Sequence, residues 1–199
     1  MRTALLALFT ATVLWFGLED WRQRRIDQPP GVLVAESPDQ FELPSAPAIR
    51  HAGYTLTPRA GIRVTARILA AERYRFSRTS DLMPRDLALG WGVMSDSAVL
   101  DQLTISQSDR FYFWRTKTSV LPAPFDLISA SSANMHLIAA SPDIAKVIDR
   151  ARVGQIITFS GRLVDVLASD GGQMKTSLTR NDTGAGACEI VYVEAARLP

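Results

Sequence analysis

Cysteine and histidine are scarce in this chain of 199 residues, which contains one cysteine, Cys188, and two histidines, His51 and His136. A single cysteine excludes an intrachain disulfide and a cysteine-rich metal site. The two histidines lie far apart in the sequence and have no metal-ligand spacing. We therefore expect neither a bound metal nor another cofactor. Internal repeats and low-complexity tracts are also absent from the sequence.

Charge is absent from Thr3 to Leu18, and the charged sequence EDWRQRR follows. A helix of these 16 residues spans roughly 24 Å, slightly less than the ~30 Å hydrocarbon core of a bilayer. A cleaved signal peptide would fit this length, but Trp15 stands where a small-x-small cleavage site needs a small residue. We therefore expect residues 1–25 to form an uncleaved signal-anchor, a single transmembrane helix with Trp15 and Trp21 at the lipid headgroups. A cleaved signal and a buried helix are the alternatives.

The positive charges around this segment do not agree on its orientation. Arg2 precedes the apolar run, whereas Arg22, Arg24 and Arg25 follow it, which favours a cytoplasmic domain under the positive-inside rule. A two-residue tail before an apolar core is, however, the usual form of an export signal. We expect a single-pass protein of the inner membrane with its domain on the periplasmic side.

The remaining chain divides into a linker and one domain. Residues 26–50 contain five prolines, which fix φ and lack a donor, so this segment is predicted to be an extended spacer. Its apolar residues, at 32–34 and 41–43, would allow it to lie along the domain. Residues 51–199 have the size of a single domain with one core.

The residue pattern of this domain predicts a mainly β fold with one or two short helices. The strongest helix is Ser141–Arg152, because Ser141 can cap it, Pro142 suits the first turn and Gly154 suits its end. A shorter helix is predicted at 95–103. Strands are predicted at 62–68 with a continuation to 76, at 104–106, at 110–114, in pieces of 125–138, and at 155–167, 174–179 and 188–193.

Three strands, a helix and two further strands follow the order of the OB-fold, a five-stranded Greek-key barrel. The segment GQIITFSGRLVDV, which begins at Gly154 after the predicted helix, fits the fourth strand of such a barrel. We therefore predict a small Greek-key, OB-like barrel preceded by an N-terminal membrane helix. A β-sandwich or another small barrel would share much of this order.

Three segments carry a resemblance to other proteins: DLALGWGVMSD at 86–96, SANMHLIAAS at 132–141 and TRNDTGAGACE at 179–189. Together they resemble a group of bacterial proteins that have a short N-terminal hydrophobic segment. The resemblance covers most of the chain after residue 60. It implies a bacterial source and no particular activity.

The candidates for catalysis are His136, Asp182 and Cys188. The triplet DTG that begins at Asp182 copies the signature of aspartic proteases, although a hairpin loop also favours these residue types. Cys188 and His136 could form a thiolate–imidazole pair, with Asp182 or Asn134 orienting the ring. A lone cysteine at the start of the apolar strand CEIVYV is, however, typical of a small buried hydrophobe. We therefore expect a chain that does not act as an enzyme.

Aromatic residues supply two possible contact surfaces. Trp91 lies between Gly90 and Gly92, where it could stack on a ligand or anchor a partner, although a ring that plugs one end of the barrel is the interpretation we favour. The four consecutive aromatic residues at 111–114 would point to opposite faces of a strand. Two of them must therefore face away from the core.

Arginine is concentrated between residues 51 and 85. This segment contains seven arginines and two acidic residues, Glu72 and Asp81. Four of these arginines would share one face of an unbroken strand: Arg63, Arg67, Arg73 and Arg75. Such a stripe could bind anionic lipid, an acidic polymer or a nucleic acid, although a solvated strand face with acidic neighbours is the simpler interpretation. The membrane segment argues against nucleic acid as the partner.

These features predict a membrane-tethered binding or assembly module of the bacterial envelope, with the membrane and an envelope protein as partners. One alternative is a hydrolase that uses Cys188 and His136, or Asp182. The other is an OB-like binder of an anionic polymer or nucleic acid through the arginine stripe. Burial of Cys188 and His136 separates the first two functions, and surface charge over the arginines separates the third.

Overall fold

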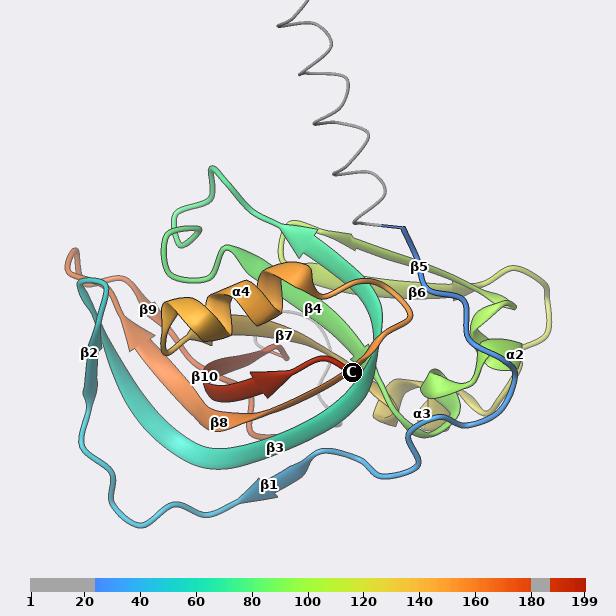
Figure 1. Ribbon diagram of the computed structural model, residues 1–199, viewed down its shortest axis with the longest axis horizontal. Helices are drawn as coiled ribbons and strands as arrows, with labels where there is room; N and C mark the ends of the chain where they lie inside the picture. The colour runs from blue at the N-terminus through green and yellow to red at the C-terminus, as the bar shows by residue number, and fades with distance from the viewer. Residues whose placement is uncertain (1–23, 180–186) are drawn as a thin grey trace, which may run out of the picture.

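The computed structural model describes residues 24–179 and 187–199 (Figure 1). The apolar run of the predicted signal-anchor and the candidate Asp182 both lie outside the described residues. Within the described ranges, no helix combines the length and the hydropathy needed to cross a bilayer. The described chain is mainly β, with three short helices and a sheet of eight strands, which confirms the predicted mainly β fold, although one or two helices were predicted.

Most of the predicted elements are present, and three strands that were not predicted are added at Asp39–Phe41, Ile49–His51 and Arg85–Gly90. The elements are β1 (Asp39–Phe41), β2 (Ile49–His51), β3 (Tyr54–Arg73), β4 (Arg85–Gly90), the 3₁₀ turn η1 (Gly92–Ser95), α2 (Ser97–Leu100), β5 (Leu103–Ser108), β6 (Phe111–Thr116), α3 (Phe125–Ala130), β7 (Ser132–Ala139), α4 (Pro142–Arg150), β8 (Ile156–Leu167), β9 (Gln173–Met174) and β10 (Glu189–Arg197). Three strand predictions are wrong in part. Residues 125–130 form α3 rather than strand, and β3 ends at Arg73, so that Phe76 lies in a loop and is 99% exposed. Of the strand predicted at 174–179, only its first residue is in a strand, because β9 ends at Met174.

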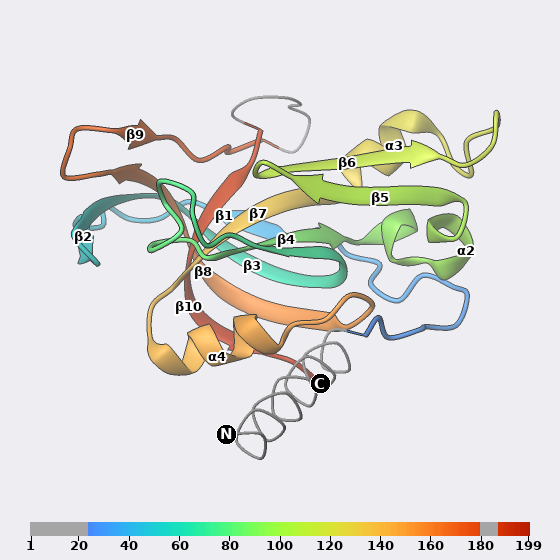
Figure 2. The ribbon, with the colours of Figure 1, turned by 90° about the horizontal axis from the view of Figure 1, so that it is seen from above.

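The large sheet is organised around β3, the longest strand. Its order is β1-β3-β4-β7-β10-β8-β9, and β2 also pairs with β3. Neighbouring strands are antiparallel except β7 and β10, which are parallel. β8 also pairs with β3, from Thr55 opposite Leu167 to Arg67 opposite Ile156, so the pairings lead back to the strand from which they started. The β5–β6 hairpin forms a separate two-stranded sheet, and Figure 2 shows it on the side of the central strands opposite α4.

The main core lies between the inward faces of these strands and α4. On β3 the residues Ile62, Val64 and Ala66 are buried, whereas Arg63 and Thr65 between them point outward, as the alternating sequence predicts. Inward residues of β4, β7, β8 and β10 join the same cluster. This face of β3 therefore holds the strands and the helix in one core.

Helix α4 closes one side of this core and confirms the strongest helix prediction. The Ser141 side chain caps it by accepting from the backbone N–H of Ile144 at 3.4 Å, and Pro142 is its first residue. Ile148 is 4% exposed and Ala151 is 1% exposed, and both belong to the main core. Packing of its apolar face therefore stabilises the helix, because a helix this short is marginal on its own.

The proline-rich segment lies along the domain, as its apolar residues allow. β1 pairs with β3, and the backbone N–H of Gly92 donates to the carbonyl of Val34 at 2.7 Å. Val34 is 6% exposed and packs in the main core. Nearer the start of the described chain, the N–H of Ile26 donates to the carbonyl of Val153 at 2.8 Å. The spacer is thus docked at several points along its length.

Candidate functional site

The predicted arginine stripe does not form one surface, because β3 contains a β-bulge. Its register with β4 shifts between Ile68 and Ala70, so the alternation of side chains inverts there. Ile68 and Ala71 both contact the main core. They are three residues apart, whereas residues that share a face of a regular strand are two apart. Residues before and after the bulge that share odd numbers therefore face opposite sides of the sheet, and β3 ends before Arg75.

The two arginines before the bulge are engaged in local contacts. Arg67 is 1% exposed and donates to the carbonyl of Ser95 at 2.9 Å and to the hydroxyl of Ser97 at 2.8 Å. Burial is the main cause that lowers its pKa. Arg63 is exposed and pairs with Asp39 at 2.8 Å. Arg67 is thus a structural residue, whereas Arg63 is an isolated, neutralised charge.

The predicted aromatic surfaces have different outcomes. Trp91 is 3% exposed, packs in the main core and donates through Nε1 to the carbonyl of Ala130 at 3.1 Å, so it plugs the core rather than presenting a platform. On β6, Phe111 is 38% exposed and Phe113 is 52% exposed, whereas Trp114 packs inward. The prediction that two of these four rings face away from the core is confirmed.

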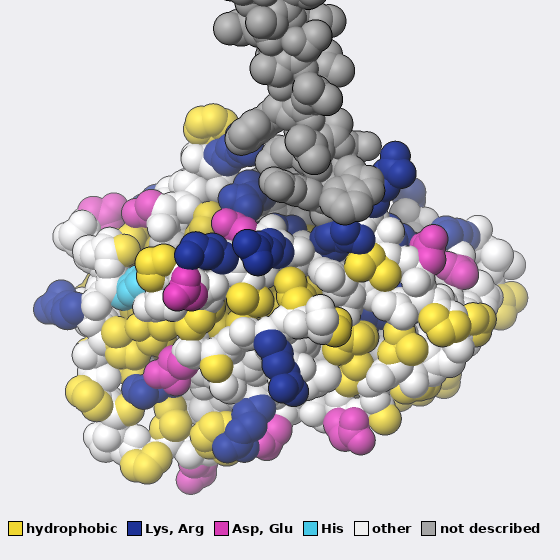
Figure 3. All heavy atoms as spheres, in the orientation of Figure 1, with side chains coloured by type: hydrophobic (Ala, Val, Ile, Leu, Met, Phe, Trp, Pro, Cys, Tyr) yellow, Lys and Arg dark blue, Asp and Glu magenta, His cyan; other side chains and the backbone are white. Residues whose placement is uncertain are grey.

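Arg73 and Arg75 belong instead to a larger basic surface, the arginine groove. It has a volume of about 980 Å³ and gathers residues from the ends of β3, β4, α4 and β10. Its arginines are Arg73, Arg75, Arg85, Arg150, Arg152 and Arg197. Asp149 is the acidic side chain among the residues that line it. Figure 3 shows Lys and Arg side chains gathered on the face that carries α4.

Two arginines of the groove hold helix α4 in place. Arg85, which is 8% exposed, donates to the carbonyls of Asp149 and Ala151, and Arg73 pairs with the Asp149 carboxylate at 2.7 Å. The last carbonyls of a helix have no partner within the helix, and a guanidinium there also opposes the negative end of the helix dipole. Burial, followed by the charge of Arg73, lowers the pKa of Arg85.

The other arginines of the groove carry charge that the described residues do not neutralise. Arg75, Arg150 and Arg197 are exposed and form no ion pair with any residue of the described ranges. The Nε of Arg152 is buried without a hydrogen-bond partner among the described atoms. A concave surface with unbalanced positive charge focuses the electrostatic potential and attracts anions.

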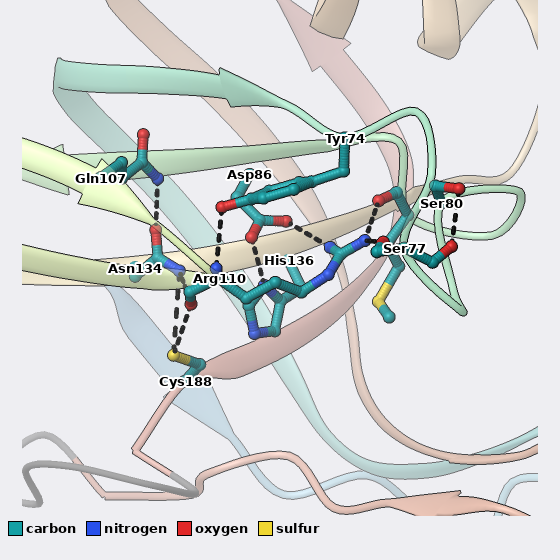
Figure 4. Close-up of polar contacts among 10 residues, drawn as sticks. Tyr74, Ser77, Ser80, Asp86, Gln107, Arg110, Asn134, His136 and Cys188 are labelled. Atoms are coloured by element: carbon teal, nitrogen blue, oxygen red, sulfur yellow. Dashed lines mark hydrogen bonds and ion pairs between the residues drawn. The ribbon is translucent and has the colours of Figure 1, made fainter.

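A second polar cluster lies on the outer face of β4, β7 and β10, and we call it the thiol–imidazole cluster (Figure 4). It consists of Asp86, Asn134, His136 and Cys188, with Arg110 covering them. Asp86 lies directly opposite His136 in the antiparallel pair of β4 and β7. Cys188 precedes β10 by one residue, and Ile190 of that strand pairs with His136. The strand register therefore brings side chains from distant parts of the sequence to one place.

The histidine of this cluster is buried and lies between a carboxylate and the thiol. Nδ1 of His136 is 2.8 Å from Oδ2 of Asp86, which is fully buried and also pairs with Arg110 at 3.0 Å. Burial acts most strongly on the pKa of His136 and lowers it, but the contacts with Asp86 and Cys188 together outweigh burial and raise the pKa to about 9. His136 is therefore protonated at neutral pH.

Cys188 is half-buried and is held by two further contacts. Its Sγ accepts from Nδ2 of Asn134 at 3.8 Å and donates to the carbonyl of Arg110 at 3.7 Å. The amide of Asn134 is itself fixed, because its oxygen accepts from Gln107 at 2.6 Å. These contacts hold the thiol in one position, so its side chain does not rotate freely.

Arg110 joins the β5–β6 hairpin to this cluster. It lies in the turn of the hairpin with a φ of 68°, and its guanidinium lies 4.2 Å from the centre of the Tyr74 ring. It also donates to the hydroxyl of Ser77 at 2.8 Å and to the carbonyl of Met83 at 3.0 Å. Burial raises the pKa of Tyr74 to about 12, so this ring stays neutral.

The structure brings together two of the three candidate catalytic residues, His136 and Cys188. Asn134 was one of two residues predicted to orient the imidazole ring, but it contacts the thiol instead, and Asp86, which lies against the ring, was missed. The sequence does contain a signal that could have identified Asp86. The three segments that carry the resemblance contribute Asp86, then Asn134 and His136, then Cys188. The described residues contain no group of three or more His, Cys, Asp or Glu that could hold a metal ion.

Comparison of the chain with protein-family models, with curated proteins and with solved structures found no significant match.

Proposed function

We propose that this chain is a membrane-tethered binding module of the bacterial envelope whose domain is an OB-like barrel. Its ligand is the negatively charged, phosphate-bearing headgroup of a membrane lipid, which binds in the arginine groove. The unneutralised charge of Arg75, Arg150 and Arg197 in a groove of about 980 Å³ carries this proposal. Residues 3–18 supply the tether as an uncleaved transmembrane helix, with the domain on the periplasmic side of the inner membrane.

The strand pairings support the OB-like barrel. In an OB-fold the first strand pairs with the second and the fourth, and the helix lies between the third and fourth strands. We assign these five places to β3, β4, β7, β8 and β10, because α4 lies between β7 and β8 in the chain and β8 pairs back to β3. The parallel pair of β7 and β10 lets the last strand enter between the third and the fourth.

Burial in the fold favours the groove over the usual ligand face of such a barrel. OB-folds commonly bind ligands on the outer face of the second and third strands. All six residues of β4 are buried here, and the β5–β6 hairpin with α2 and α3 packs on that side. The arginine groove, by contrast, presents the exposed side chains of Arg75, Arg150 and Arg197.

The route of the chain supports a lipid headgroup as the ligand. The N–H of Ile26 donates to the carbonyl of Val153, and the Gln28 amide donates to the carbonyl of Gly154 at 3.1 Å. Arg152 and Gln155, which flank these two positions, line the groove. The segment that leads from the predicted membrane helix is therefore fastened at the rim of the groove, close to where a bilayer would lie.

The chemistry of the groove suits phosphate. A guanidinium offers a planar fork of donors that matches phosphate oxygens, and it stays charged at any physiological pH. A basic residue near an anionic membrane surface contributes about 1 kcal/mol, so the three exposed arginines together contribute about 3 kcal/mol, or roughly 100-fold in affinity.

The test uses the full chain in nonionic detergent, because the membrane segment is part of the protein. Native mass spectrometry counts the bound molecules of a short-chain phosphatidylglycerol, with phosphatidylcholine of the same chain length as the neutral comparison. The wild-type chain should retain phosphatidylglycerol preferentially. The triple variant R75Q/R150Q/R197Q should lose this preference, with an apparent affinity lower by about 100-fold.

A matched control removes the same charge from other faces of the domain. R50Q/R63Q/R115Q changes three exposed arginines outside the groove and should retain wild-type binding. Equal retention of phosphatidylglycerol by the groove variant would contradict the proposal. Glycerol phosphate that binds as tightly as the lipid, or an oligonucleotide that displaces it, would replace the lipid by a soluble ligand or a nucleic acid.

A further inference from the structure

The thiol–imidazole cluster brings a carboxylate, an imidazole and a thiol together outside the arginine groove. Two adjacent strands, β4 and β7, carry Asp86, Asn134 and His136, and Cys188 lies in the bend one residue before β10. Asp86 and His136 are direct cross-strand neighbours, and alternate residues of a strand share a face, which places Asn134 beside them. Cys188 joins them through its contact with Asn134.

The carboxylate lies against the imidazole ring. Oδ2 of Asp86 lies 2.8 Å from Nδ1 of His136, and the second carboxylate oxygen is held by Arg110 at 3.0 Å. This short contact lacks the angle of a hydrogen bond, since neither Oδ2 nor Nδ1 has a hydrogen-bond partner among the described atoms. Figure 4 shows the ring of His136 between Asp86 and Cys188, and the thiol is one of the two side chains that raise the pKa of this histidine.

We propose that Cys188 is a nucleophile for acyl transfer, with His136 as its acid–base partner and Asp86 as the residue that positions His136. The substrate class is an ester or thioester. The three roles are those of a thiol, an imidazole and a carboxylate in a triad, which is recognised by geometry and not by sequence order. The chain order here is Asp86, His136, Cys188.

The reaction balances with one proton and no other reagent than water. As Sγ of Cys188 bonds to the carbonyl carbon, the bond from that carbon to the leaving oxygen or sulfur breaks, and the thiol proton passes by way of His136 to the leaving group. Water then attacks the thioester on Cys188, and His136 passes a proton from this water to Sγ. The carboxylic acid leaves, and the thiol is regenerated.

Two contacts adapt the site to this role. Nδ2 of Asn134 donates both to the carbonyl of Arg110 at 2.9 Å and to Sγ at 3.8 Å, so one of its N–H groups is directed at the sulfur. Asn134 therefore fixes the position of the sulfur beside His136.

The test exploits the single cysteine of the chain, since thiol chemistry of the full-length protein then reports only this position. The folded wild-type chain is treated with iodoacetamide at neutral pH, and with phenyl acetate followed by peptide mass analysis. We expect alkylation about 100-fold faster than at a matched exposed thiol, and one acetyl group transferred to Cys188. The matched thiol is C188S/S108C, in which Ser108→Cys lies on an exposed position of β5.

His136→Gln should reduce both reactions to the level of the matched thiol, and Asp86→Asn should reduce them in part. Circular dichroism shows whether each variant folds. If neither variant folds, the reaction rates of the wild-type chain and of C188S/S108C still test the proposal. Alkylation no faster than at the matched thiol, acetylation of other residues only, or a folded His136→Gln variant with unchanged rates would overturn the proposal.

Discussion

Raising the pH should destabilise this protein through one residue, His136. Its pKa in the folded state is raised to about 9, because Asp86 and Cys188 together outweigh burial, whereas a free histidine has a pKa of about 6.5. A pKa that is higher in the folded state stabilises the fold wherever the group is protonated in both states. This contribution is therefore complete below about pH 6.5 and is lost as the pH rises to about 9.

The magnitude follows from the difference between the two pKa values. Each unit corresponds to about 1.4 kcal/mol, so the wild-type chain should lose about 3 kcal/mol of unfolding free energy between pH 6 and pH 9. The side chain of His136 is 11% exposed, so solvent screens this contribution only weakly. The charged and titratable groups that face it are Asp86, Arg110, Tyr74 and Cys188.

Urea unfolding of the full chain in nonionic detergent, repeated across this range, measures the loss. His136→Gln is the control, because it retains the other groups of the cluster and their own titrations. The difference in unfolding free energy between the two chains should decrease as the pH rises. A wild-type stability that is flat from pH 6 to 9, or an equal decline in His136→Gln, would refute the reasoning.

Two further predictions concern the packing of the domain. Ile148→Asp should lower the free energy of unfolding by about 3–5 kcal/mol, because it buries an unpaired charge at a position that is 4% exposed, whereas Lys146→Ala on the exposed face of α4 should change the urea midpoint little. Gly154→Ala should cost about 2 kcal/mol more than Gly171→Ala in the same assay. Both glycines have φ near +90°, but only at Gly154 would the added Cβ meet a backbone atom, the carbonyl oxygen of Ile26 at 1.8 Å.

Much of the fold follows from local patterns in the sequence. The alternation at 62–68 and the cap, proline and apolar face of α4 each predict the observed element, because the signal lies within one element. Residues 125–138 were predicted as pieces of strand, but the first six form α3, with Ile128 fully buried against the hairpin side of the sheet. Short apolar segments of this kind suit either structure until their packing partners are known.

The candidate sites could be predicted only in part, because each depends on strand register. A single bulge in β3 separates Arg67 from Arg73, and no local feature of the sequence marks it. The arginine groove collects Arg85, Arg150 and Arg197 from three further elements. His136 and Cys188 were candidates by residue type, but Asp86 becomes their partner through its register opposite His136.

The most direct measurement of the central claim is hydrogen exchange of the full wild-type chain in nonionic detergent, with and without phosphatidylglycerol. Binding in the arginine groove predicts protection in peptides that cover residues 73–76, 149–153 and 194–198, and no change with phosphatidylcholine. Protection confined to the β5–β6 hairpin, where Phe111 and Phe113 are exposed, or no protection at a saturating lipid concentration would contradict it.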